Sequence, residues 1–311
     1  MPSQYLDLLK AALCASLYDE SAWRVVEGPM RHHPNSTLTH TIIAHVQYAV
    51  LRFLRAHGLI LVRPTSFNED ARQNGNDWPM FGYTMKGRKR LDALEACIEN
   101  ILHDEIPGDF IETGVWRGGS VILMRAVLRT HGITNRTVWC ADSFEGMPVP
   151  KETDKQISDT ADFSDRAYLT VTEEQVQRNF SRFGLLDKQV KFLKGWFCDS
   201  LPNAPIEKLA LLRLDGDLYE STMDALTHLY DKVSPGGYVI VDDYNSWGGC
   251  HHAVDEFRLK RRIVEPIVEI DSHAIFWRRL SKQQCLPQGG CCNSTADRDR
   301  ATAAIISDSS G

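Results

Sequence analysis

Four aspartates close two consecutive apolar runs in the middle of the chain. Asp215 and Asp217 follow the run KLALLRL, and Asp242 and Asp243 follow the run YVIV. The segment between the runs has helical length, which is enough to bring two parallel strands side by side. Their ends would then crowd four carboxyl groups at one edge of a sheet. Such charges repel each other unless they bind a cation or take part in chemistry.

The types and spacing of these acids favour a magnesium site. Asp215, Asp242 and Asp243 offer hard oxygen ligands from neighbouring strand ends, as Mg²⁺ prefers. Asp217, two residues beyond Asp215, would face the same pocket without ligating. It is the candidate general base, because a cation lowers the pKa of a bound hydroxyl toward the range of a carboxylate. In the alternative interpretation, Asp215 or Asp243 only caps the helix that follows it.

A glycine-rich turn follows an earlier apolar strand. The segment Glu112-Thr-Gly114-Val-Trp-Arg-Gly-Gly119 ends that strand and begins a helix, where free amides attract an anion. Trp116 stands where a dinucleotide-binding turn needs its second glycine, which disfavours NAD. A tight turn without a ligand is the alternative.

Asp142 ends the second strand of this pattern, and an acid there can hold the two hydroxyls of a ribose. Together with Glu112 and the glycine turn, Asp142 favours S-adenosylmethionine over NAD. Ser143 lies in the same turn and is a second candidate cofactor contact. Alternatively, Asp142 only forms the turn before Ser143.

Other polar and aromatic residues have two open interpretations. Trp196, in KGWFCDSLP, either stacks on an adenine or packs in the core. His251 and His252 are interpreted as exposed residues at a helix start rather than as second bases. Arg117 and Arg125 are expected to be solvent-exposed or ion-paired.

These groups need a mainly parallel sheet to position them. Strands and helices alternate from residue 109 onward, and two final apolar segments, PIVEI and HAIFWRR, resemble an antiparallel pair. A capping box begins a helix at Thr172. We predict an N-terminal helical region over residues 1–100, a catalytic domain over 101–280 and a disordered tail over 281–311. The polar insertion at 148–170 has no assigned role.

Composition excludes several partners. The 311 residues carry a net charge of −6 with a pI of about 6.0, which gives no electrostatic reason for binding nucleic acid or an anionic membrane. No apolar run approaches the roughly 18 residues of a membrane helix. The N-terminus predicts an amphipathic helix, not a signal peptide, so we expect a cytoplasmic protein whose eight cysteines are mostly buried free thiols.

Several segments together resemble the macrocin O-methyltransferase family. They are DWP, TMKGRKRLDAL, GDFIETGVWRGGSVILMRAVL, ADSFEGMP, VKFLKGWFCDSLP, LLRLDGDLYESTMDALTHLY, SPGGYVIVDDY and AVDEF. The resemblance runs from Tyr5 to Arg279. The run Cys250-His251-His252, the insertion after Pro148 and the tail depart from the family pattern.

The resemblance implies a class I methyltransferase (Rossmann-like) α/β fold with an N-terminal helical lid. It implies Mg²⁺ on Asp215, Asp242 and Asp243, and Asp217 as the base. Thr84 and Met85 match the lid over the cofactor S-adenosylmethionine, while Glu112, Gly114 and Asp142 match cofactor contacts.

The expected reaction is methylation of a sugar hydroxyl, with a small-molecule glycoside as acceptor and a homo-oligomeric enzyme. A Mg²⁺-dependent catechol O-methyltransferase and a non-catalytic cofactor-binding protein are the alternatives.

Overall fold

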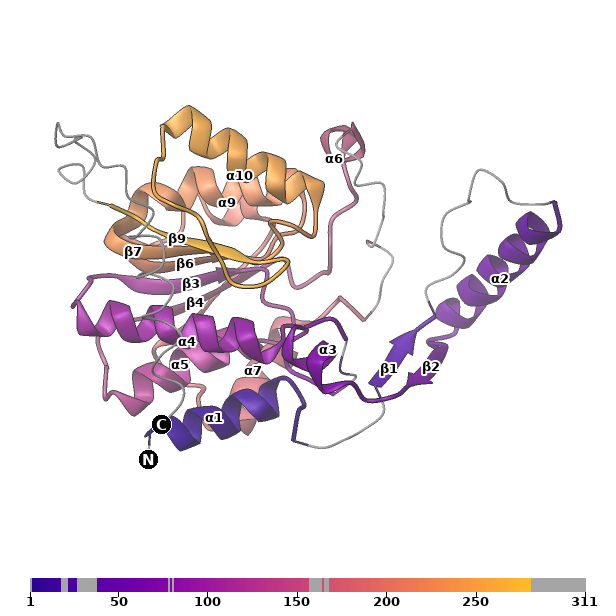
Figure 1. Ribbon diagram of the computed structural model, residues 1–311, viewed down its shortest axis with the longest axis horizontal. Coiled ribbons are helices and arrows are strands. Elements are labelled where there is room, and N and C mark those ends of the chain that lie inside the picture. The colour runs from indigo at the N-terminus through magenta and orange to yellow at the C-terminus, as the bar shows by residue number, and fades with distance from the viewer. Residues whose placement is uncertain are drawn as a thin grey trace, which may run out of the picture. The chain divides into compact units, whose positions relative to one another are not determined.

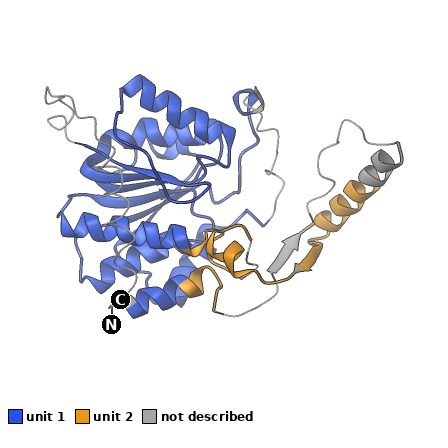
Figure 2. Cartoon of the chain, in the orientation of Figure 1, with its two compact units in different colours: residues 1–10, 89–311 blue, residues 11–88 orange. Residues whose placement is uncertain are grey.

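The chain forms two compact units. The computed structural model describes residues 2–17, 22–26, 38–77, 79, 81–156, 164 and 168–280. One unit comprises residues 11–88, and the other comprises residues 1–10 together with 89–311 (Figure 2). Helix α4 (Arg88–His103) falls almost wholly in the larger unit, although the sequence prediction assigned residues up to 100 to a separate N-terminal region.

A seven-stranded sheet in the order β5-β4-β3-β6-β7-β9-β8 organises the larger unit. Neighbouring strands from β5 to β7 pair in parallel, whereas β9 is antiparallel to both β7 and β8. The predicted antiparallel closing pair is therefore confirmed. The strand bounds are β3 (Asp109–Thr113), β4 (Val138–Asp142), β5 (Val190–Lys194), β6 (Leu209–Leu214), β7 (Val233–Val241), β8 (Val268–Glu269) and β9 (Ile275–Arg278).

Helices cover both faces of this sheet, as expected for parallel strands. Figure 1 shows α9 and α10 on one face and α4, α5 and α7 on the other. The bounds of the remaining helices of this unit are α5 (Gly119–Thr130), α6 (Glu152–Gln156), α7 (Glu173–Arg182), α8 (Phe197–Ser200), α9 (Tyr219–Leu229), the short 3-10 helix (Tyr230–Lys232) and α10 (Gly248–Arg261).

Local sequence explains these elements well. All six residues of β6 are buried, as a central strand covered on both faces requires. Helix α4 buries one apolar face, which comprises Leu91, Leu94, Cys97, Ile98 and Ile101. The predicted capping box at Thr172 is present, with Gln175 as its reciprocal partner, and α7 begins directly after it.

The smaller unit contains two short strands besides its helices. Besides the end of α1 (Pro2–Leu13), α2 (Leu38–Ala56) and α3 (Glu69–Gln73), it contains the antiparallel pair β1 (Ala22–Val25) and β2 (Val62–Thr65). Each of these strands is only four residues long, too short for periodicity to separate it from a loop. A buried ion pair between Arg72 and Asp77 (2.8 Å) holds the segment after β2.

Some predictions fall on residues outside the described part of the chain: the disordered tail at 281–311, the thiols of Cys285, Cys291 and Cys292, and most of the centre of the 148–170 insertion. The five cysteines that the structure describes are free, and all but Cys198 are buried. Across the described residues, no helix combines the length and the apolar character needed to cross a membrane.

Candidate active site

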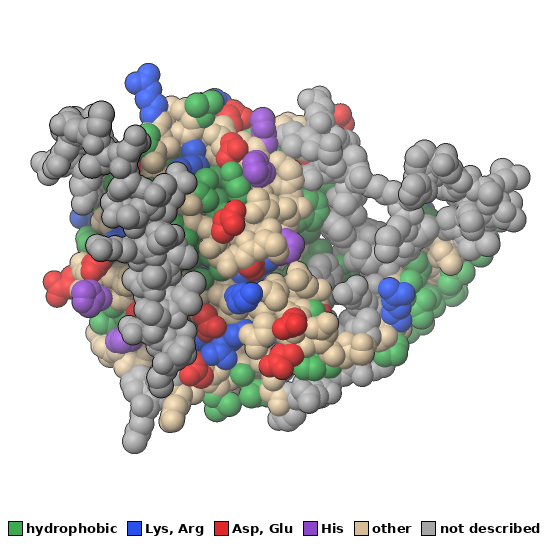
Figure 3. Space-filling model, in the orientation of Figure 1, with side chains coloured by type: hydrophobic (Ala, Val, Ile, Leu, Met, Phe, Trp, Pro, Cys, Tyr) green, Lys and Arg blue, Asp and Glu red, His purple; other side chains and the backbone are tan. Residues whose placement is uncertain are grey.

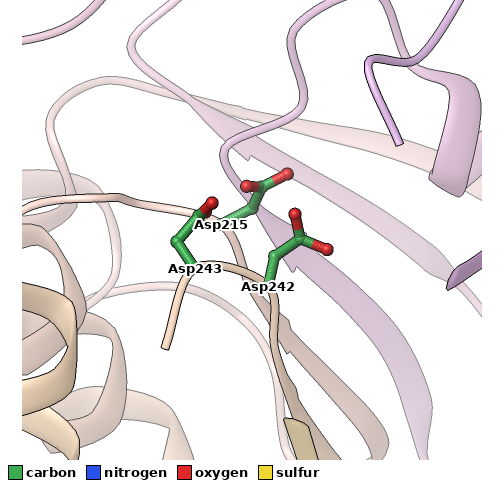
Figure 4. Close-up of side chains that lie close together, drawn as sticks. All are labelled: Asp215, Asp242 and Asp243. Atoms are coloured by element: carbon green, nitrogen blue, oxygen red, sulfur yellow. The ribbon is translucent and has the colours of Figure 1, made fainter. Parts of the chain in front are cut away.

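Three of the four predicted acids come together at the carboxyl edge of the sheet. Asp215 follows β6, and Asp242 and Asp243 follow the neighbouring strand β7. Each offers one carboxylate oxygen, and these oxygens all lie within 4.8 Å of one another. In Figure 4 the three carboxylates gather on the same side of the two strand ends. They form the one candidate metal-binding group of three or more side chains within the described residues.

Backbone hydrogen bonds place these acids. The Asp215 amide donates to Thr113 O of β3 and the Asp242 amide donates to Leu214 O of β6, each at 2.9 Å. These contacts extend the sheet by one residue past each strand end. The capping alternative is not observed, because Leu218 and Trp247 occupy the N-cap positions of α9 and α10.

Asp217 lies in a different backbone environment from Asp215. It has φ = +58°, and the Leu218 amide donates to Gly216 O at 2.6 Å across it. This is a three-residue turn with a positive central φ, a rare and strained conformation. Aspartate tolerates positive φ better than most residues. The turn therefore separates Asp217 from the strand that positions Asp215.

Two buried arginine side chains, from β6 and α4, form ion pairs with these acids. Arg213 of β6 is buried and donates to Glu112 of β3, to Asp215 (3.0 Å) and to Asp242. Arg90 of α4 donates to the other oxygen of Asp242 at 2.7 Å. Burial alone would lower the pKa of the Arg213 guanidinium, but Asp242, Glu112 and Asp215 raise it, so the group stays charged.

Carboxylates still outnumber these guanidinium groups. Arg90 also donates to Asp271 at 2.6 Å, so Arg90 and Arg213 together contact four acids, and Asp243 lies close to two of them. The oxygen-only ligand set of Asp215, Asp242 and Asp243 fits a divalent cation such as Mg²⁺.

Sequence reasoning missed both arginines. A charge inside the buried run KLALLRL requires buried counterions, and this signal marks Arg213. Arg90 lies on the apolar face of α4, one turn before Leu94, and the same reasoning applies there.

The glycine-rich turn packs directly against the acids. Gly114 has φ = +92°, and a Cβ built on it would lie 1.9 Å from Asp215 O. Glycine is therefore required by the neighbouring backbone as well as by any ligand. Gly118 also has φ = +92° and is the N-cap of α5, which receives no side-chain cap. The N-terminus of α5 is a position where backbone amides bind anions, which suits the carboxylate of S-adenosylmethionine.

Asp142 accepts hydrogen bonds from the glycine-rich turn and from the loop after β4. Its Oδ2 accepts from the amides of Val115 (2.7 Å) and Trp116 (3.3 Å), and its Oδ1 accepts from the Phe144 amide (2.8 Å). Burial raises the pKa of this carboxyl, although the three amides oppose the shift. The turn-forming interpretation is thus observed, and a ribose contact remains a prediction.

The remaining predicted cofactor residues are spread over both units. Glu112 is buried beside Arg213, Ser143 donates to Gly146 O at 3.0 Å, and Trp196 is 38% exposed before α8. Thr84 and Met85 belong to the unit of residues 11–88. There the Thr84 amide donates to Leu13 O at 3.3 Å.

Two tyrosines close in sequence to the predicted site aspartates contact side chains of α10. The Tyr244 hydroxyl donates to Asp255 at 2.7 Å, and its ring stacks on His251 at 4.1 Å between centroids. A second group of the same kind comprises Tyr219, His252 and Glu256. Both histidines also pair with the acid four residues later, as expected for residues on a helix surface. Arg125 is ion-paired with Asp187, as predicted.

A solved structure shares this fold. The O-methyltransferase NovP superposes with a TM-score of 0.73 at 41% sequence identity, over 90% of this chain and 100% of that chain. The protein therefore has the class I methyltransferase fold, with the mainly parallel sheet that the sequence predicted, and it is an S-adenosylmethionine-dependent O-methyltransferase.

Sequence comparisons identify the family. The model of the macrocin O-methyltransferase (TylF) family matches residues 2–279. The demethyldecarbamoylnovobiocin O-methyltransferase of Streptomyces niveus is 51% identical over 219 residues, 70% of this chain and 83% of that protein. The 8-demethyl-8-(2,3-dimethoxy-alpha-L-rhamnosyl)-tetracenomycin-C 4'-O-methyltransferase of Streptomyces olivaceus is 54% identical over 213 residues, 68% of this chain and 81% of that protein. The chain belongs to the macrocin O-methyltransferase family.

Proposed function

We propose that this protein methylates a sugar hydroxyl of a glycosylated natural product in a Mg²⁺-dependent reaction. The observation that carries the proposal is the cluster of Asp215, Asp242 and Asp243 at two neighbouring strand ends, with Gly114 of the glycine-rich turn packed against Asp215. The name of the Streptomyces olivaceus relative, which includes a rhamnosyl group, supports a sugar as the acceptor.

Each predicted site residue has a proposed role. Asp215, Asp242 and Asp243 would hold the ion. The cofactor would be held by Thr84, Met85, Glu112, Gly114, Asp142, Ser143 and Trp196. When bound, S-adenosylmethionine supplies an electrophilic methyl group, and the ion supplies positive charge that orients hydroxyls and lowers their pKa.

Asp217 accepts the proton that the acceptor hydroxyl loses. With S-adenosylmethionine bound, transfer of its methyl group from sulfur to this oxygen would give a methyl ether and S-adenosylhomocysteine. Orientation of the hydroxyl supplies a large part of the rate, because a positioned nucleophile reacts as if at very high concentration. The rigid strand ends that carry Asp215 and Asp242 suit this task.

Metal removal and replacement test the proposal. We expect the enzyme to methylate a deoxysugar glycoside, to lose activity in EDTA and to regain it with Mg²⁺, with a simple catechol as the competing acceptor. Asp243→Asn should weaken Mg²⁺ binding in calorimetry by about tenfold or more, because metal affinity follows the charge of the ligand set.

Asp231→Asn is the matched control, since Asp231 is a surface acid paired with Arg261. Full activity in EDTA, or unchanged Mg²⁺ binding by a folded Asp243→Asn protein, contradicts the metal site. Preference for the catechol contradicts the sugar acceptor.

A further inference from the structure

Helix α9, which begins two residues after Asp217, receives its N-terminal cap from a distant segment. Its own N-cap residue, Leu218, has no polar side chain. Instead, Asp154 of α6 accepts the Tyr219 amide at 2.7 Å, although it lies 65 positions earlier in the chain. A carboxylate at this position satisfies an orphan amide and interacts favourably with the positive end of the helix dipole.

The Asp154 side chain is buried, and both of its oxygens accept hydrogen bonds. It is 1% exposed, and its other oxygen accepts the Lys151 amide at 3.2 Å. Lys151 also pairs with Glu220 in the first turn of α9. This second contact is solvent-exposed, and such surface pairs contribute at most about 1 kcal/mol. The hydrogen bond from Tyr219 to the buried carboxylate is therefore the principal link between α6 and α9.

The cap acts next to the strained turn at Asp217. The turn is closed by the Leu218 amide, and the following amide, that of Tyr219, is held by Asp154. A non-glycine residue at positive φ costs on the order of 1–3 kcal/mol and persists only where its surroundings hold it. Asp154 thus restrains the turn on its C-terminal side.

The C-terminal end of the same insertion contacts the glycine-rich turn and the loop after β4. Trp116 of the glycine-rich turn donates its indole N–H to Tyr168 O at 3.1 Å. Thr170 donates to Glu145 O, at 3.4 Å, in the loop after β4. The described ends of the 148–170 insertion therefore contact the first residue of α9, next to the turn of Asp217, and the glycine-rich turn.

We propose that Asp154 is a positioning residue for methyl transfer, which holds the turn that aims the Asp217 carboxylate. The importance of this role for catalysis rests on the proposed function of Asp217. It assigns a task to an insertion that the sequence left without one.

Substitutions of Asp154 test the proposal from the carboxylate side. In Asp154→Ala we expect faster amide hydrogen exchange at residues 218 and 219 and a kcat lower by roughly tenfold or more, because small misplacements of reacting groups are costly. The dissociation constants for Mg²⁺ and S-adenosylmethionine should stay within about twofold, since the other acids are untouched. Asp154→Asn should restore most of the exchange protection and of kcat, because its amide oxygen still accepts the Tyr219 N–H.

Substitutions of Tyr219 test it from the donor side. Proline at the first helical position is tolerated, and Leu218 before it already has the extended backbone (φ −87°, ψ 160°) that proline requires. Tyr219→Pro removes the donated N–H, whereas Tyr219→Ala removes only the side chain. We expect kcat to fall further in Tyr219→Pro than in Tyr219→Ala, and to fall little more when Asp154→Ala is added.

A third variant controls for lost stability. Asp187→Asn removes the partner of buried Arg125 before β5, away from the acids, and should lower stability without changing kcat. The proposal is overturned if Asp154→Ala keeps kcat within about twofold, if Asp154→Asn is as impaired as Asp154→Ala, or if Tyr219→Pro matches Tyr219→Ala. The proposed function can fail separately. If the wild-type enzyme does not methylate the glycoside, the sugar acceptor is overturned. If hydrogen exchange at residues 218 and 219 still increases in Asp154→Ala, the role of Asp154 in holding the turn is supported.

Discussion

At the scale of residues, Asp215 and Asp217 are separated by one glycine but have different backbone surroundings. Asp215 continues the hydrogen-bond ladder of β6 and pairs with Arg213. Asp217 lies at positive φ in a three-residue turn. A carboxylate fixed to a strand end suits ligation, whereas one outside the ladder suits proton transfer. The backbone thus supports the proposed division of roles.

Replacing Asp217 with asparagine tests its role as base. Asn tolerates positive φ as Asp does, so the turn should persist. We expect kcat to fall on the order of 10²-fold or more, because the side chain no longer accepts a proton. Mg²⁺ and S-adenosylmethionine binding, measured by calorimetry, should remain close to wild type. Near wild-type turnover by Asp217→Asn would contradict the role of Asp217 as the general base.

At the scale of elements, the helices that begin at the acidic edge lack caps of their own. The N-cap residues of α5, α9 and α10 are Gly118, Leu218 and Trp247, and none makes a side-chain cap. Helix α7, by contrast, has the full capping box at Thr172. Among these three helix starts, α9 receives a cap from a distant residue, Asp154.

The capping box of α7 allows a direct measurement of local stability. Thr172→Ala should lower the free energy of unfolding by about 1 kcal/mol, because the Gln175 amide loses its acceptor. Thr172→Ser keeps the hydroxyl and should retain most of this stability. Urea denaturation of the three proteins is the measurement. Equal stability of Thr172→Ala and wild type would show that the box contributes nothing.

At the scale of the whole molecule, the smaller unit presents an apolar surface. The described part of α2 exposes Val46, Tyr48, Val50 and Phe53, each at least 50% exposed, and Figure 3 shows hydrophobic side chains gathered there. Val46, Val50 and Phe53 lie at helical spacing on one face, and an exposed apolar face often marks a protein interface. The proposed homo-oligomer is expected to use this helix, with a second copy of the chain as the partner.

Light scattering tests the interface. Phe53→Ser should raise the dissociation constant of the oligomer by about tenfold, as truncation of a central aromatic residue in an interface does. Leu259→Ser is the control, because Leu259 is 80% exposed on α10. A monomeric wild type, or equal effects of the two substitutions, contradicts the prediction.

Local patterns were sufficient for most of the sheet. The alternation of apolar runs and amphipathic helices predicted the parallel strands, and turn residues marked where each strand ends. The pattern failed at β1 and β2, because strands of four residues carry too little periodicity. The predicted N-terminal region extends to residue 100, whereas α4 lies almost wholly in the larger unit, because amphipathicity shows that a helix packs but not which element it packs against.

The sequence by itself determined that acids close β6 and β7, and that a glycine turn precedes α5. These are properties of short segments, and parallel strands bring their carboxyl ends to one edge whatever the details of packing. Only the tertiary structure decided how the charges are shared. Arg213 and Arg90 reach Asp242 from β6 and α4, and Asp154 reaches the start of α9 across 65 positions. Such pairings depend on how distant segments pack, and no local pattern encodes them.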